Sequence, residues 1–353
     1  MDSLPSNVRN VPAGLLGAIL IIAATERLVQ SNHLHFADDV AMTWASKLRG
    51  IEQGRCCSPQ IALGSSVFLR GLAPNAFGSR TNDPAHHAPP LCYNLGLQGM
   101  HPHGYAMVLD RYLRHNPPPA TVLLDAAPGP MTYAPGDTYI GGYLRVMFSS
   151  NELSRMFVAS PNPGVLLEWT GYRILPSLRY RDGLNNYISQ ILLTGTPPVA
   201  YRKRNAEFAD RLDRDRGFRA GPDKRISLAS IERSAAKIRT FHVDPFMQAA
   251  FDAIVDRCRA HKIRCVIIPP PFPEFLTRDP NKADYFRAYF DWLDRYARRP
   301  GVEVMDPIVL PAESFFDIVH VNPVGASRFS QHVGAWLAQD DTVRVNEREY
   351  ALR

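Results

Sequence analysis

The feature that most constrains this chain is the stretch from Ile61 to Leu72, Ile-Ala-Leu-Gly-Ser-Ser-Val-Phe-Leu-Arg-Gly-Leu. A short apolar run stops at Gly64, and two serines separate it from an amphipathic run. This pattern predicts a buried strand, a sharp turn and a helix. Ser66 would then lie beside the free backbone N–H groups and the positive dipole end of the helix, where nucleophilic hydroxyls are often placed. A helix N-cap formed by Ser65 or Ser66 is the simpler alternative.

A second stretch, residues 315–326, supplies an acid and a base close together in the sequence. Asp317 and His320 lie three residues apart, and Asn-Pro-Val-Gly then leads into a helix predicted over residues 326–337. If the backbone turns between them, the carboxylate accepts one imidazole N–H, and the other ring nitrogen is free to take a proton from a hydroxyl. A solvated Asp and His in a loop is the alternative. The combination with Gly64-Ser65-Ser66 is more specific than either stretch alone.

Between these stretches, apolar runs alternate with amphipathic ones. Because strand and helix alternate, the pattern predicts a parallel sheet with helices on both faces. Residues 131–240 break the alternation, and we interpret them as an insertion or lid that shapes the acceptor site; their charged part, 202–239, is expected to be a solvated surface. The predicted strands are 61–63, 91–95, 120–124, 263–268 and 302–305, and the predicted helices are 38–48, 105–114, 144–156, 184–193, 244–261 and 285–298.

On these motifs the chain resembles the SGNH hydrolases, also called GDSL-type esterases. Gly64-Ser65-Ser66 matches the first block of the family, with Ser65 in place of Asp, and Asp317 and His320 match the last block. The run from Asn94 to Gly99 fits the second block, whose glycine N–H stabilises the oxyanion. The third block should offer an Asn, but here the strand 120–124 runs into Asp125. Asn94 is therefore considered as a substitute donor.

The resemblance implies a flavodoxin-like three-layer α/β/α fold with a catalytic triad of Ser66, His320 and Asp317. Gly99, Asn94 and Ser65 are the expected oxyanion and substrate-binding residues, and neither cofactor nor metal is expected. The implied activity is hydrolysis or transfer of an acyl or acetyl group, on an envelope carbohydrate or similar ester, through an acyl-enzyme. Some outlying members with Gly-Ser-Ser look like cell-envelope acyl- and acetyltransferases rather than free esterases. A non-catalytic scaffold or binding protein of the envelope is the alternative.

Histidines offer a different class of site. His86-His87 and His101-Pro102-His103 could be two halves of a metal site, although no acidic or cysteine ligand is spaced to complete the set, and solvated loop histidines are the alternative. The cysteines have no metal-type spacing and do not decide the redox compartment. They are Cys56, Cys57, Cys92, Cys258 and Cys265.

The N-terminal segment indicates a membrane. Residues 11–24 are almost wholly apolar, which is short for a span of about 20 residues but suits a signal segment or a thin anchor. We expect an anchor or signal segment over 1–27, a connecting helix over 28–57, the SGNH-like domain over 58–340 outside the cytoplasm (periplasmic or on the outer face), and a polar tail over 341–353. An ordinary buried helix is the alternative. The net charge of +6 is too mild to indicate nucleic acid as a partner.

Overall fold

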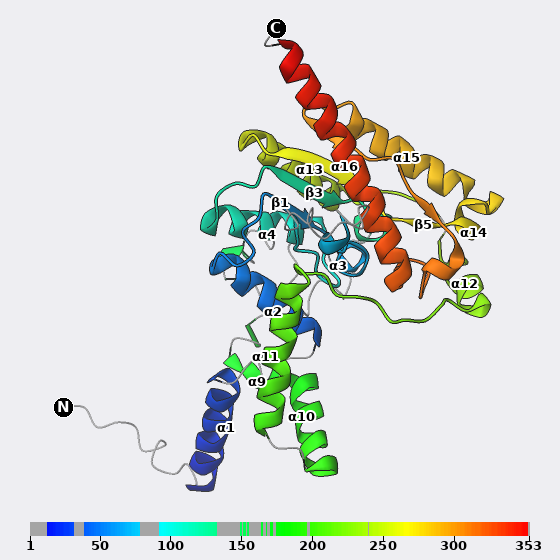
Figure 1. Cartoon of the computed structure of the whole chain (residues 1–353). Helices are drawn as coiled ribbons and strands as arrows, with labels where there is room; N and C mark the ends of the chain where they lie inside the picture. Colours follow the sequence, from blue (N-terminus) through cyan, green and yellow to red (C-terminus); the bar gives the residue numbers. More distant parts are fainter. Residues whose placement is uncertain are drawn as a thin grey trace. The chain divides into compact units, whose positions relative to one another are not determined.

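The computed structural model describes residues 13–31, 39–77, 92–132, 149, 151–152, 154, 164, 167, 170–171, 174–195, 198–238 and 240–351. They belong to two compact units, both drawn in Figure 1. The helical unit contains the described residues of 1–42 and 162–208, and the sheet unit contains those of 43–161 and 209–353. Every residue of the predicted catalytic site lies in the sheet unit.

The sheet unit is built on five parallel strands in the order β2-β1-β3-β4-β6. Each strand begins and ends within one residue of its predicted bounds. The register is continuous across the sheet, with Ile61 opposite both Tyr93 and Val122, and Val122 opposite Cys265. The predicted α/β class and parallel sheet are therefore confirmed. The strands are β1 (Gln60–Leu63), β2 (Cys92–Asn94), β3 (Thr121–Asp125), β4 (Arg264–Ile268) and β6 (Val302–Val304).

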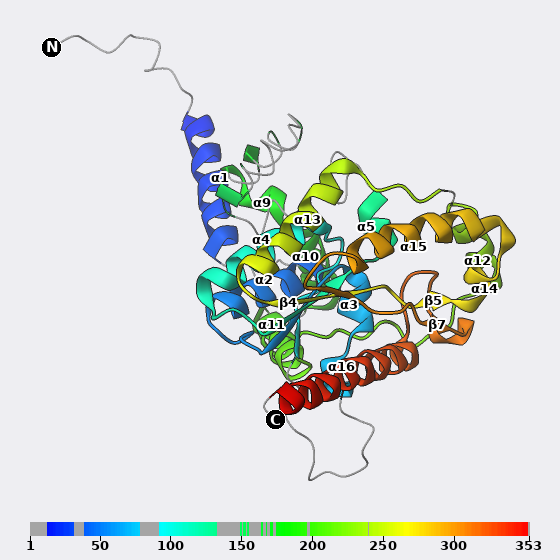
Figure 2. The ribbon, with the colours of Figure 1, turned by 90° about the horizontal axis from the view of Figure 1, so that it is seen from above.

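Helices lie on both faces of this sheet, an arrangement compatible with three α/β/α layers (Figure 2). On one face, α3 (Ser66–Gly71) packs against α16 (Pro323–Ala351). On the other, α4 (Pro102–His115) packs against α13 (Pro245–Ala260), and α15 (Ala283–Ala297) contacts β6. Because both faces are covered, the strands are almost continuously apolar and buried. The core under α16 includes Ala62, Phe68, Leu123, Val266, Phe329 and Val333.

The strand order determines where a site can form. From β1 the chain crosses to β2 on one side, whereas β3 lies on the other side of β1. The connection after β1 leads to β2 on one side, and the connection after β3 leads to β4 on the other side. The two connections therefore diverge and leave a crevice at the carboxyl ends of β1 and β3, where open α/β sheets bind ligands. Ser65 follows β1 and Asp125 ends β3, so both lie at this crevice.

Several elements were not predicted. A second parallel pair, β5 (Phe272–Pro273) with β7 (Val309–Leu310), lies beyond the carboxyl ends of the main strands, and its strands of two residues are too short to give a pattern. The final helix α16 continues to Ala351, through most of the predicted tail 341–353. The other helices are α2 (Asp39–Glu52), α5 (Pro128–Thr132), α9 (Pro176–Arg179), α10 (Arg181–Thr194), α11 (Pro198–Arg214), α12 (Leu228–Ala235) and α14 (Glu274–Thr277).

Part of the charged segment 202–239 is not a solvated surface, which corrects that expectation. The backbone N–H of Asn94 donates to the carbonyl of Arg216 at 2.8 Å, and the Tyr93 hydroxyl donates to Asp213 at 3.0 Å. The Arg216 Nε also donates to the carbonyl of Cys92 at 3.2 Å. This segment therefore covers the free edge of β2, whose unpaired backbone groups would otherwise be open to solvent. The predicted helix 144–156 falls mostly outside the described residues.

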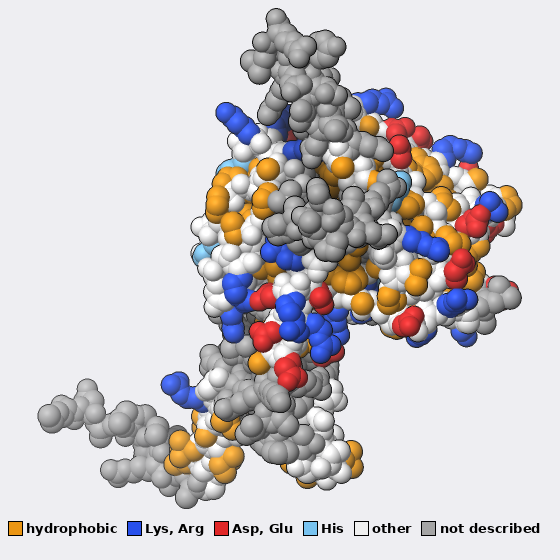
Figure 3. Space-filling view, viewed as in Figure 1, with side chains coloured by type: hydrophobic (Ala, Val, Ile, Leu, Met, Phe, Trp, Pro, Cys, Tyr) orange, Lys and Arg blue, Asp and Glu red, His pale blue; other side chains and the backbone are white. Residues whose placement is uncertain are grey.

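The helical unit exposes large apolar side chains. In α1 (Ala13–Ser31), Leu20 and Ile21 are more than two-thirds exposed, and in α10 so are Leu192 and Leu193. Figure 3 shows hydrophobic side chains on both helices. Within the described part of the chain, no helix is long and apolar enough to cross a membrane.

Candidate active site

Ser66 and His320, 254 positions apart in the sequence, meet at the carboxyl edge of the sheet. The Ser66 Oγ lies 2.7 Å from His320 Nε2, and His320 Nδ1 lies 2.8 Å from Oδ2 of Asp317. Because an ionised carboxylate only accepts, the imidazole donates from Nδ1 to Asp317, which leaves Nε2 to accept the Ser66 hydroxyl proton. The structure thus brings together the hydroxyl, imidazole and carboxylate that the two motifs indicated.

Asp317 holds the loop as well as the ring. Its Oδ1 accepts the backbone N–H groups of Val319 at 2.8 Å and His320 at 2.7 Å, which turns the chain back so that Oδ2 reaches the imidazole. Burial opposes ionisation of this carboxyl, but the hydrogen bond from His320, the charge of that ring and the two backbone donors outweigh it. The pKa of Asp317 consequently lies below its ordinary value.

The turn that presents Ser66 is fixed by Ser65 and Asp125. Ser65 is the N-cap of α3, where its Oγ accepts from the Val67 N–H at 3.1 Å. The same hydroxyl donates to Asp125 Oδ2 at 2.7 Å, and the Ser65 N–H donates there too at 2.8 Å. Gly64 is required because a Cβ would lie 2.6 Å from that of Asp125. The two serines therefore have different roles: Ser65 is the helix N-cap, and the hydroxyl of Ser66 faces His320.

The glycine-rich loop 94–99 lies directly against this turn. The Leu97 N–H donates to the carbonyl of Gly64 at 2.9 Å. Two side chains of α2 support the loop from behind: the Trp44 Nε1–H donates to the Gln98 carbonyl at 3.2 Å, and the fully buried Lys47 donates to the Gly96 carbonyl at 2.6 Å. Sequence reasoning missed both, because a Trp and a Lys in a predicted connecting helix give no sign of a distant partner.

The Gly99 N–H is oriented by this support. In a trans peptide the C=O and N–H point in opposite directions, so a Gln98 carbonyl turned toward Trp44 turns the Gly99 N–H away from α2. Gly99 has φ +72°, a left-handed conformation that favours glycine. The Gly99 N–H has no partner among the described residues, as a donor reserved for a ligand requires.

Asn94 does not contribute a donor, which corrects its suggested role as a substitute. Its side chain is fully buried, and its NH2 group donates to the carbonyls of Phe68 at 2.7 Å and Leu72 at 2.6 Å. Its Oδ1 accepts the Gly96 N–H at 2.8 Å. Both amide protons are therefore occupied, and Asn94 closes the C-terminal end of α3 instead of facing the site.

Asp125, at the end of β3, accepts hydrogen bonds that hold the turns around it. Besides the two bonds from Ser65, it accepts the Ala127 N–H at 2.8 Å. Complete burial raises the pKa of this carboxyl, and these three donors partly offset the effect. The sequence marked Asp125 as a polar residue directly after a predicted buried strand, but it gave no sign that Ser65 would be its partner.

The outer face of the imidazole is packed. Phe316 stacks on His320 with ring centroids 5.5 Å apart and planes 9° apart. The Arg70 guanidinium lies 5.7 Å from the centre of the Phe316 ring and donates to Gln98 at 3.2 Å. These contacts restrict the ring of His320 and connect it with the loop that carries Gly99.

No protein-family model and no curated protein matched this chain.

A cavity of about 480 Å³ opens beside the triad. His320, Asp317 and Val319 form one wall, and α5 contributes Gly129 and Thr132. Pro270, Pro271, Phe272, Leu276 and Tyr285 add a largely apolar surface, and Ser234, Lys237 and Thr240 add polar groups. The cavity is thus continuous with the imidazole, and Ser66 is not among its described lining residues.

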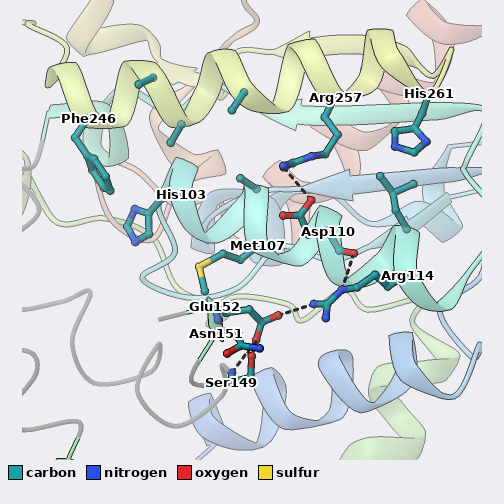
Figure 4. A pocket seen from close by; sticks show the side chains of 15 residues that line it. His103, Met107, Asp110, Arg114, Ser149, Asn151, Glu152, Phe246, Arg257 and His261 are labelled. Carbon is teal, nitrogen blue, oxygen red and sulfur yellow. Dashed lines mark hydrogen bonds and ion pairs between the residues drawn. The ribbon is translucent and has the colours of Figure 1, made fainter. Parts of the chain in front are cut away.

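A second, larger cavity of about 740 Å³ lies between α4 and α13 (Figure 4). Phe246 and His103 lie at one end, and the Asp110–Arg257 ion pair, at 2.9 Å, lies toward the other. His101 and His103 stack with centroids 6.2 Å apart inside the protein instead of in a solvated loop. Among the described residues, no cluster of three or more metal-binding side chains is present. His86-His87 lie outside the described residues.

Proposed function

We propose that this chain is a serine esterase or O-acyltransferase of the SGNH type, with the flavodoxin-like sheet of that family. The single observation that supports the proposal best is the continuous hydrogen-bond chain from Ser66 through His320 to Asp317 at the carboxyl edge of a parallel sheet. The strand order supports it too, since flavodoxin-like sheets carry their ligands at the point where the strand connections diverge.

In the proposed reaction, His320 Nε2 takes the proton from the Ser66 hydroxyl as Oγ attacks an ester carbonyl carbon. The carbonyl π electrons move onto oxygen, and the N–H groups of Ser66 and Gly99 stabilise the oxyanion. Asp317 stabilises the imidazolium and holds its tautomer. When the tetrahedral intermediate collapses, the bond to the alcohol oxygen breaks and His320 donates its proton to that oxygen. An acyl group remains on Ser66.

The second half uses the same groups in reverse. His320 takes a proton from water or from an acceptor hydroxyl, whose oxygen attacks the acyl-enzyme carbonyl. Collapse then releases the acid or the new ester and returns the proton to Ser66. Water gives an esterase, and a sugar hydroxyl gives a carbohydrate O-acyltransferase. An acylated envelope carbohydrate or similar ester is the proposed substrate. No step in this scheme needs a cofactor.

The test is reaction with a fluorophosphonate probe, which labels activated serine hydroxyls. We expect the full chain to be labelled at Ser66 and Ser66→Ala to abolish labelling. Ser65→Ala is the matched control, because it removes a neighbouring hydroxyl that is bound to Asp125 and not to His320. Its Ser66 should still be labelled, at a reduced rate because Ser65 holds the turn, and the lost N-cap should cost about 1 kcal/mol of stability. Labelling that persists in Ser66→Ala, or a folded wild-type chain that is never labelled, would refute the proposal.

A non-catalytic scaffold is the second candidate, and the replacement of the third-block Asn by Asp125 favours it. The side-chain donor expected there is missing, and each lost oxyanion donor costs about 100- to 1000-fold in rate. A scaffold predicts an unlabelled Ser66 and an unchanged cellular phenotype in Ser66→Ala.

The proposed location is the membrane surface outside the cytoplasm. The exposed leucines and isoleucines of α1 and α10 support it, since apolar patches of this kind mark membrane or protein contacts. Deletion of residues 1–27 should shift the chain from the membrane fraction to the soluble fraction. Equal membrane recovery of both forms would contradict an anchor.

A further inference from the structure

The cavity of about 480 Å³ is lined by His320 and Asp317, two residues of the proposed catalytic triad. Their position determines whether the alcohol or the acyl component of an ester can enter it. The imidazole donates a proton to the departing alcohol oxygen and takes one from the acceptor oxygen. Both oxygens must therefore approach within hydrogen-bond reach of His320 Nε2. The acyl carbon, in contrast, is bonded to Ser66 Oγ, and Ser66 is absent from the described lining of the cavity.

On this basis we propose that the cavity is the site of the alcohol component, as leaving group or acceptor, and that it takes a bulky hydroxy compound with an anionic group. The inference rests on the proposed serine chemistry but adds a substrate class to it. The volume is within the range of small-molecule pockets, and a short alcohol or water would leave most of it empty.

The walls indicate the shape of the ligand. Pro270, Pro271, Phe272 and Leu276 give a rigid apolar surface, and Tyr285 adds an aromatic side chain. The hydroxyls of Thr132, Ser234 and Thr240 add hydrogen-bonding groups. Apolar walls with a few polar groups suit a ring compound that carries hydroxyls.

The charge of the lining indicates the anion. Lys237 is exposed, and among the described lining residues it is the only lysine or arginine. Asp317 is the only carboxylate among them, and its oxygens already bind His320 and the loop N–H groups. The formal charges of Lys237 and Asp317 therefore cancel, since His320 is neutral when its Nε2 accepts from Ser66. Because the carboxylate is turned to His320 and the loop, Lys237 is the charged group of the described lining that a ligand can contact, and it attracts a carboxylate or phosphate on the alcohol.

The first test compares two fluorogenic acetates with the same acyl group: neutral methylumbelliferyl acetate and the acetate of umbelliferone-acetic acid, which carries a carboxylate. We expect Lys237→Ala to lower kcat/KM for the anionic ester about fivefold relative to the neutral one, the effect of a close exposed ion pair, and Lys237→Glu to lower it further. Lys224→Ala is the matched control, since Lys224 is also exposed but lies outside the lining. An unchanged ratio in both Lys237 variants would overturn the charge assignment.

The second test blocks the cavity. Gly129 lines it, and a Cβ there would meet no atom within 4 Å, so Gly129→Phe adds a ring without a local backbone clash. We expect this variant to lose activity on umbelliferyl acetates at least tenfold more than on methyl acetate, whereas Gly171→Phe, at an equally open glycine outside the lining, should change neither. Equal losses on both esters would overturn the assignment of the cavity.

Binding separates failure of this inference from failure of the proposed chemistry. Ser66→Ala should bind umbelliferone-acetic acid, measured by its fluorescence, and Gly129→Phe introduced in that background should abolish binding. If wild-type Ser66 is not labelled by fluorophosphonate, the serine chemistry fails regardless of this result. If Ser66 is labelled but the alcohol does not bind, or binds equally in the blocked variant, the inference alone fails.

Discussion

The buried histidine His103, on α4, allows a quantitative test of the packing between α4 and α13. Both ring nitrogens are buried without a hydrogen-bond partner in the described structure, and the ring lies 5.5 Å from Phe246. Burial, together with the charge of His101, lowers the pKa of His103 from 6.5 to about 3. The folded protein therefore holds this imidazole neutral over a range in which an unfolded chain protonates it.

The sign of the pH effect follows from that depressed pKa. The stabilising contribution of His103 is fully present above pH 6.5 and is lost as the pH falls toward 3, because only the unfolded state binds the proton. Between about pH 7.5 and 4.5 the wild-type chain should lose about 3 kcal/mol of unfolding free energy through this one residue. His101, whose pKa burial also lowers, adds a loss in the same direction.

The perturbation is His103→Leu, an apolar side chain that cannot titrate. Urea unfolding of the full chain, followed by near-ultraviolet circular dichroism across that pH range, gives the slope of stability against pH for each protein. The variant should show a flatter slope by about 2 to 3 kcal/mol over the range, whatever its stability at neutral pH. His115→Leu is the matched control, because His115 is exposed on the same helix. Parallel slopes for wild type and His103→Leu would refute the assigned burial.

Three further predictions concern the site itself. Asp317→Asn should lower kcat by about 10⁴-fold on any ester that the wild type turns over, and a loss below tenfold would contradict a triad. Because folding lowers the pKa of Asp317, the stability difference between this variant and wild type should shrink as the pH falls through that lowered pKa. Trp44→Phe should reduce the fluorophosphonate labelling rate about ten- to a hundredfold by releasing the Gln98 carbonyl, with the melting temperature nearly kept, and an unchanged rate would show that the loop needs no such support. Asp125→Ala should lower the unfolding free energy by more than about 2 kcal/mol in urea titration, since the N–H groups of Ser65 and Ala127 lose their acceptor; a smaller change would mean that other groups replace it.

The sequence predicted the sheet well because its strands are buried on both faces. Apolar runs such as residues 263–268 have few other structures open to them, and this run lies between two strongly periodic helices, α13 and α15. The proximity of the candidate residues was predictable for a related reason, since the parallel topology brings short motifs at strand ends to one edge of the sheet. Whether Ser66 and His320 would meet could not be read from spacing alone.

Residues whose role is set by distant packing could not be predicted. Asn94 has an amide that could donate to a ligand, but both of its N–H groups donate to carbonyls at the end of α3. The segment around Arg216 is charged and so resembles a solvated surface, although its backbone pairs with the edge of β2. In both cases the deciding partner lies more than 20 positions away and contributes backbone atoms, which leave no mark in the side-chain pattern.

The separation of Ser66 from His320 has a consequence for biosynthesis. A growing polypeptide displays the hydroxyl early, but the imidazole that would activate it is translated 254 codons later. Until the ribosome has passed His320, the emerging protein contains a serine with ordinary reactivity. Under the proposed chemistry, competence would therefore begin only after residue 320 has been translated and folded against Ser66, and fragments that stop before it would be inert toward the cell's own esters.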